Sequence, residues 1–149
     1  MFQGAIQLNL DSKGRLAIPA KHRDVLLAQC AGKLVLTADH QDACLLIYPE
    51  PEWAPISEKL QKMPALNPQV RQLQRRLLGH AETIEMDAVG RVLVSSTLRD
   101  YAKLDKQVVL VGQGNKFELW DQQRWGKLSE EVIDFGDGSL PPGMEGFTL

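Results

Sequence analysis

The sequence predicts a mainly β fold with short helices (α+β), built from two copies of one small module. The first observation is an internal repeat, in which an Asp-x-x-Gly-Arg motif occurs at residues 11–15 and again at residues 87–91. The second is that short apolar or alternating runs, bounded by turn residues, surround both motifs, as is typical of β-strands. The third is that a helical periodicity prevails between the two copies.

The repeat extends well beyond this motif. Residues 34–36 match residues 108–110, residues 45–48 match residues 117–120, and Trp53 matches Trp125. The spacing between matched blocks shortens only where turns are expected, and loops tolerate deletions. A chance match would not keep its order through all these blocks, so the sequence indicates a duplication.

Each copy is predicted to contain the same elements in the same order. A strand ends at the Asp, the Gly supplies a positive φ in a tight turn, and a second strand follows. A short helix then begins, at Pro19 in the first copy and at residues 95–97 in the second, and a hairpin closes the copy. Apart from the strand before each turn, the predicted strands are residues 15–18, 34–37, 44–48, 91–94, 108–111 and 116–120.

The segment between the copies is predicted to form two helices. One covers residues 52–63, and Asn67 caps the other, which ends at Gly79. The predicted organisation is a first module at residues 1–52, a helical linker at 53–80, a second module at 81–127 and an acidic, poorly ordered tail at 128–149.

The charge is unevenly distributed along the chain. The net charge is −2, yet all 17 Lys and Arg residues lie in residues 1–127, while the tail carries only acidic charges, Asp137 among them. A mildly basic body permits nucleic-acid binding, because affinity for DNA depends on a local patch.

Several classes of protein are disfavoured by the composition. No apolar run approaches the roughly 20 residues of a membrane span, and the N-terminus does not resemble a signal peptide. Cys30 and Cys44 are predicted to be two buried thiols of a cytoplasmic protein. The histidines, His22, His40 and His80, are scattered without metal-ligand spacing, so neither an enzyme, a cofactor nor a metal is expected.

The repeated motif suggests a DNA-reading surface. Arginine is the side chain best suited to a bidentate contact with guanine in the major groove, which makes Arg15 and Arg91 the candidate readers. Lys13 lies in the same turn as Arg15, and Lys21 and Arg23 are close enough in sequence to reach phosphates.

The acidic residue of each motif has two possible roles. Asp11 and Asp87 can accept backbone N–H groups of their own turns and set the turn geometry. Alternatively, each forms a surface salt bridge with the Arg, worth at most about 1 kcal/mol. The spacing alone favours the salt bridge, which is a purely structural role. The duplication favours a role of the turn in binding DNA.

Residues 1–127 resemble the AbrB/SpoVT superfamily and, more closely, the MraZ proteins, which carry two such modules in tandem. The motifs that carry this resemblance are Phe2-x-Gly4, Leu10-Asp11-Ser12-Lys13-Gly14-Arg15-Leu16, Ile18-Pro19, Leu46-Ile47-Tyr48-Pro49 followed by Trp53, Leu78-Gly79-His80-Ala81, Asp87-x-x-Gly90-Arg91 and Gly112-Gln113-x-Asn115-Lys116-Phe117-Glu118-Leu119-Trp120.

The resemblance implies a pseudo-twofold double-split β-barrel with swapped hairpins, formed within one chain. It also implies a cytoplasmic, nucleoid-associated regulator that assembles into a homo-oligomeric ring. The ring would bind short G-rich direct repeats in double-stranded DNA and repress its own operon of cell-division and cell-wall genes. The Asp11–Arg15 and Asp87–Arg91 motifs would form the DNA-contacting surface, with no small-molecule ligand. Val89 replaces Lys13 in the second copy, so Arg91 is expected to contribute less than Arg15.

Other functions are expected to rank lower. A toxin-neutralising antitoxin of a related fold would need a toxin-binding tail, and the tail here has few apolar anchors. A scaffold without DNA binding would not need paired Arg turns. Binding of RNA would favour exposed aromatic residues. Tyr48, Trp53, Trp120 and Trp125 recur at matched repeat positions, which predicts that they pack in the interior.

Overall fold

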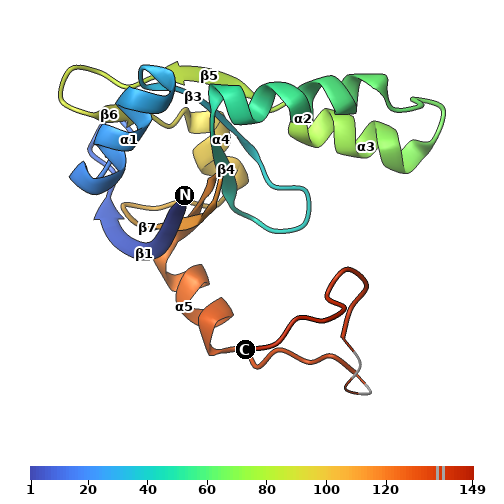
Figure 1. The fold of residues 1–149 in the computed structure, drawn as a ribbon. Helices are drawn as coiled ribbons and strands as arrows, with labels where there is room; N and C mark the ends of the chain where they lie inside the picture. Colours follow the sequence, from blue (N-terminus) through green and yellow to red (C-terminus); the bar gives the residue numbers. More distant parts are fainter. Residues whose placement is uncertain (137, 139) are drawn as a thin grey trace.

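The computed structural model describes residues 1–136, 138 and 140–149 and confirms a mainly β architecture with short helices (Figure 1). The strands are β1 (Phe2–Asn9), β2 (Arg15–Ala17), β3 (Lys33–Ala38), β4 (Leu45–Pro49), β5 (Glu82–Glu85), β6 (Arg91–Leu93), β7 (Gln107–Gly114) and β8 (Phe117–Asp121). The helices are α1 (Ala20–Cys30), α2 (Glu50–Lys62), α3 (Pro68–Leu77), α4 (Ser96–Tyr101) and α5 (Gln122–Glu130).

The two copies exchange strands with each other. The large sheet has the order β1-β7-β8-β4-β3-β5, and β2 pairs with β6 in a separate two-stranded sheet. The first strand of the first copy, β1, pairs with β7 of the second copy, while β5 pairs with β3 of the first. β4 and β8 pair at the centre of the sheet. On one side, β8 and β7 of the second copy are followed by β1 of the first copy. On the other side, β4 and β3 of the first copy are followed by β5 of the second.

The exchange explains why β7 is longer than predicted. Residues 112–114 were expected in a turn, but Gly112 and Gly114 belong to the strand, because Gly4 and Phe2 of β1 pair with them. The hairpin to β8 is correspondingly short, and the backbone N–H of Gln113 donates to the carbonyl of Lys116 at 2.9 Å.

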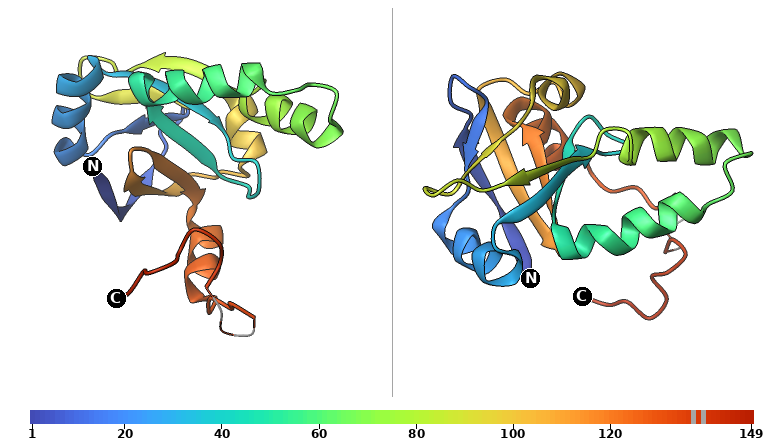
Figure 2. Two further views of the ribbon diagram at one scale, coloured as in Figure 1. Left: turned by 45° about the vertical axis from the view of Figure 1, so that its right-hand side comes forward. Right: turned by 90° about the horizontal axis from the view of Figure 1, so that it is seen from above.

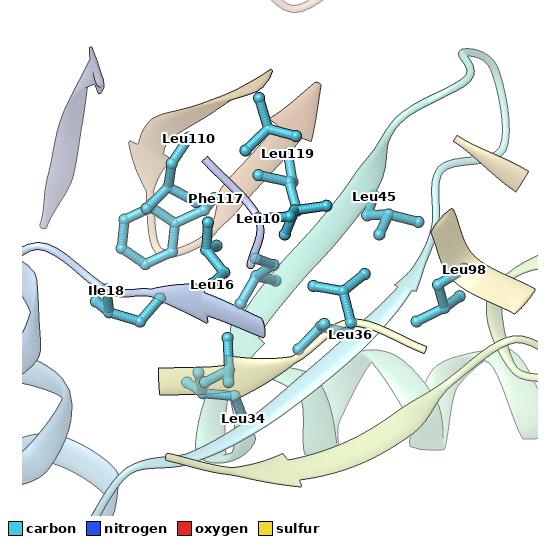
Figure 3. Packing of buried hydrophobic residues seen from close by; sticks show 14 of the residues in the cluster. Leu10, Leu16, Ile18, Leu34, Leu36, Leu45, Leu98, Leu110, Phe117 and Leu119 are labelled. Carbon is cyan, nitrogen blue, oxygen red and sulfur yellow. The ribbon is translucent and has the colours of Figure 1, made fainter. Parts of the chain in front are cut away.

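The main core lies between the large sheet and the β2–β6 pair (Figure 3). Leu16 and Val92 point into it and are almost completely buried, since alternate residues of a strand point to opposite faces. Phe117 is fully buried at the centre, with its ring centroid 4.3 Å from that of Phe2. This core is shared by both copies.

A second layer covers other parts of the sheet. Trp53 of α2 packs on Tyr48 with ring centroids 5.5 Å apart, in a cluster that also includes residues of α3. Trp125 of α5 packs 6.1 Å from Trp120. Interior packing is confirmed for Tyr48, Trp53 and Trp120, whereas Trp125 is only partly buried. Beyond this cluster, α2 and α3 project from the sheet as a helical hairpin (Figures 1 and 2).

The caps of the linker helices agree with the sequence. The Oδ1 atom of Asn67 accepts the backbone N–H groups of Gln69 and Val70 at 2.8 and 3.4 Å, and α3 begins at the next residue, as predicted. Helix α2 begins at Glu50, two residues earlier than predicted, because Pro51 is tolerated in the first helical turn.

The cysteine prediction is half right. Cys44 is fully buried, whereas Cys30 is half-buried at the end of α1, where its Sγ lies 3.2 Å from the carbonyl of Leu26. Both thiols are free.

Helix α5 extends to Glu130, into the segment predicted as tail, and Asp137 lies outside the described residues. No helix within the described part of the chain has the length and apolar character needed to cross a membrane.

Because His22 is buried, we expect the folded protein to lose stability in mild acid. His22 lies in α1 against Phe2 and Phe117, and burial, followed by the nearby charge of Lys21, lowers its pKa below the ordinary 6.5. The unfolded chain therefore takes up a proton near pH 6.5 that the folded chain does not. The free energy of unfolding should fall below that pH by less than about 1.4 kcal/mol per pH unit.

Chemical denaturation between about pH 7.5 and about pH 5.5 measures this slope. His22→Gln should flatten it, because the buried imidazole is removed. An equal slope in wild type and His22→Gln would contradict the prediction.

Candidate nucleic-acid interface

The candidate interface is the outer face of the β2–β6 ribbon. In the antiparallel register, Arg15 lies opposite Leu93 and Ala17 lies opposite Arg91. Because Leu16 and Val92 point into the core, these four residues share the outward face. The structure thus brings the two predicted readers, Arg15 and Arg91, onto one surface.

The turn that precedes β2 fixes Arg15. The Oδ1 atom of Asp11 accepts the backbone N–H groups of Lys13 and Arg15 at 2.9 and 2.8 Å. Its Oδ2 atom accepts the Nε–H of Arg15 at 2.7 Å. Gly14 adopts φ +83°, the left-handed region that favours glycine.

The turn that precedes β6 repeats this geometry. Asp87 accepts the backbone N–H groups of Val89 and Arg91 at 3.0 and 2.8 Å, and the Nε–H of Arg91 at 2.8 Å. Gly90 also adopts φ +83°. Both roles considered for the Asp residues are therefore present at once, since each carboxylate sets its turn and pairs with its Arg.

These hydrogen bonds predict an unusually acidic carboxyl group. The backbone N–H of Arg15 is the largest influence on Asp11 and, with the Arg15 side chain and the backbone of Lys13, lowers the pKa of Asp11 from 3.8 to about 2. The pKa of Asp87 is lowered too, chiefly by the backbone N–H of Arg91. The stabilisation of each turn is present above the ordinary pKa and is lost as the pH falls through the lower, folded-state value.

An NMR titration of the side-chain carboxyl carbons checks this prediction. In Arg15→Ala, the pKa of Asp11 should remain below 3.8, because the backbone N–H, which is the largest influence, is retained. A return to 3.8 in that variant would show that the side-chain pair is the dominant cause.

Each turn is also tied to the other copy. The backbone N–H of Ile18 donates to the carbonyl of Gly90 at 2.9 Å, and that of Val94 donates to the carbonyl of Gly14 at 2.9 Å. Folding of the two copies therefore sets the positions of both turns relative to one another.

Arg23, which was predicted to reach phosphates, is half-buried against the turn of the other copy. Its Nη2 donates to the carbonyl of Ile18 at 2.9 Å, and a Cβ at position 90 would collide with its side chain. Arg99 is its counterpart, with its Nε donating to the carbonyl of Val94 at 3.1 Å beneath Gly14. This geometry favours a supporting role for Arg23.

The remaining predicted residues lie at the surface, with the Nζ of Lys21 beside Gly4 of β1. Lys13 is exposed in the first turn, and Lys21 is exposed in the first turn of α1. Val89, which replaces Lys13 in the second copy, is 56% exposed. Leu93 was missed by sequence reasoning, although its spacing of two residues from Arg91 signals that both face outward.

One cluster elsewhere has the residue types of a metal site. Ligand atoms of Asp39, Cys44 and Glu118 lie within 4.8 Å of one another. However, Asp39 accepts two backbone N–H groups, and Glu118 accepts the indole N–H of Trp120 at 2.9 Å. Burial first, and then the charges of Glu118 and Asp39, raises the pKa of the Cys44 thiol, so these groups are accounted for as interior packing.

Comparison with known proteins agrees with the duplicated architecture. The sequence model of one family, described as "MraZ protein, putative antitoxin-like", matches residues 1–76 and again residues 77–137. The chain belongs to the MraZ family.

Three MraZ relatives illustrate the similarity, each named "Transcriptional regulator MraZ". The protein of Nitrosomonas europaea is 55% identical over 149 residues, and that of Nitrosospira multiformis is 53% identical over 149 residues. The protein of Halorhodospira halophila is 49% identical over 152 aligned positions. Each alignment covers all of both chains, so the MraZ resemblance seen in the sequence is confirmed.

Proposed function

We propose that this protein is a transcriptional regulator that binds double-stranded DNA sequence-specifically through the β2–β6 ribbon. The observation that carries the proposal is the presence of two arginines on one outward face, each held by an aspartate. The names of the MraZ relatives support the regulatory role. A two-stranded β-ribbon fits the major groove of B-DNA, where arginine reads guanine.

The Asp contacts favour this use of the arginines. Because Asp11 occupies the Nε–H of Arg15, the two terminal amino groups can point to the O6 and N7 atoms of guanine. A side chain that is already oriented loses less conformational entropy on binding. Asp11 and Asp87 thus act as positioning residues of the interface.

The surrounding cations have different assignments. Lys13 and Lys21 are exposed and would contact phosphates. Arg23 would act through the Gly90 turn that it supports, and a direct phosphate contact by Arg23 stays a prediction. Arg91 would contribute less than Arg15, because Val89 supplies no charge beside it.

The wider regulatory assignment follows the family resemblance. We infer that a homo-oligomeric ring binds short G-rich direct repeats upstream of its own operon of cell-division and cell-wall genes and represses it, in the cytoplasm and at the nucleoid. A ring would join several modest interfaces, so that avidity compensates for a nearly neutral chain. The proposal assigns no catalytic role, cofactor or small-molecule ligand.

We further infer the architecture of the barrel and the extents of its modules. The exchanged strands support a double-split β-barrel of swapped hairpins formed within one chain. The division into modules at residues 1–52 and 81–127, joined by a helical linker at 53–80 and followed by a tail at 128–149, accompanies it.

A gel shift on the DNA directly upstream of the protein's own gene tests the proposed function. The expected result is a shift that prefers this DNA over a shuffled duplex of equal composition and that weakens as salt rises, because bound phosphates release counterions. Equal binding to both duplexes, or none, would contradict the proposal and favour a scaffold.

A further inference from the structure

Leu93 is an exposed apolar side chain on the candidate interface, at one end of the β2–β6 ribbon. It is 47% exposed and lies directly opposite Arg15 on the outward face of the ribbon. Side chains opposite one another in an antiparallel pair have Cβ atoms about 5 Å apart. Leu93 and Arg15 would therefore meet neighbouring base pairs, which are stacked about 3.4 Å apart.

The chemistry of the major groove limits what Leu93 can contact there. Base edges in this groove present hydrogen-bond donors and acceptors, and thymine adds an apolar 5-methyl group. A leucine forms no hydrogen bond with its side chain, so the thymine methyl is its matching partner. The charges of Arg15, Lys13 and Arg91 around it match a polyanion better than an apolar protein surface.

We propose that Leu93 reads the 5-methyl group of a thymine adjacent to the guanine contacted by Arg15. This inference rests on the proposed function and assigns a base-reading role to an apolar residue of the ribbon. It also gives the two arginines unequal surroundings, because the residue opposite Arg91 is Ala17, whose side chain is a single methyl group. The neighbouring guanine and thymine are therefore expected to lie at the Arg15–Leu93 end of the ribbon.

The test is a gel shift with the upstream duplex in which each thymine in turn is replaced by deoxyuridine, which lacks the 5-methyl group. For the wild type, one replacement next to a guanine in each repeat should weaken binding about three- to fivefold, the value of one buried methyl group. Leu93→Ala should weaken binding to the thymine duplex similarly and abolish the difference between thymine and uracil. This variant gives both arginines an alanine opposite them.

Leu66→Ala is the matched control, because Leu66 is a fully exposed leucine in the loop between α2 and α3, outside the ribbon and its two turns. It should keep the preference for thymine. If wild type binds the DNA specifically and Leu93→Ala keeps the full thymine preference, the inference is overturned while the proposed function stands. If wild type does not bind specifically, both fall. A change of assembly size in Leu93→Ala on size-exclusion chromatography would assign Leu93 to a subunit contact and overturn the inference.

Discussion

Arg15→Ala is expected to reduce the affinity for the upstream DNA about 5- to 150-fold, the range for loss of one bidentate contact to guanine. The variant removes the guanidinium that Asp11 holds on the outer face, but it keeps the backbone hydrogen bonds of the turn. The fold should therefore be retained, and titrations at one fixed salt concentration should show the loss.

Three further variants sharpen this result. Arg75→Ala removes the same charge from an exposed position on α3, outside the ribbon, and should change the affinity much less. Arg15→Lys retains the positive charge but lacks the planar guanidinium group. Compared with Arg15→Ala, it should therefore recover nonspecific binding better than specific binding. Arg91→Ala should cause a smaller loss than Arg15→Ala. Equal losses in Arg15→Ala and Arg75→Ala would show that only the net charge matters.

Phe117→Ala is expected to lower the free energy of unfolding by about 3–5 kcal/mol, as large-to-small changes in protein cores do. Phe117 is fully buried on β8, and its ring packs 4.3 Å from that of Phe2 and 5.0 Å from that of His22. The substitution leaves a cavity where strands of both copies and α1 meet. Urea denaturation measures the loss.

The matched control is Phe135→Ala in the C-terminal segment, where the phenylalanine is 41% exposed, and its effect should be much smaller. Phe117→Leu should recover part of the lost stability, because it fills most of the cavity. A change below about 1 kcal/mol in Phe117→Ala would mean that the core repacks around the missing ring.

Much of the local structure could be predicted because it depends on neighbouring residues. Asn67 caps α3 through its own side chain, and each Asp-x-x-Gly-Arg turn is closed by bonds within five residues. The duplication identified the second turn from the first. Local patterns of this kind are legible in the sequence without knowledge of distant contacts.

The exchange of strands could not be derived from the residues alone. The residue pattern of β1 would fit a strand beside either β3 or β7, so the pattern alone does not identify its partner. The family resemblance suggested the exchanged arrangement. Arg23 illustrates the same limit at the level of one side chain. Its charge suggested a phosphate contact, whereas the packing of the two copies places it beneath Gly90.

The pairing of β1 with β7 has a consequence for synthesis on the ribosome. β1 emerges before its partner, residues Gln107–Gly114, which follows about a hundred residues later. Translation proceeds at about 5–20 residues per second, so β1 stays without its partner strand in the nascent chain for several seconds. During that interval it resembles the free edge strands through which proteins aggregate, and it carries no charged side chain or proline that would oppose such pairing.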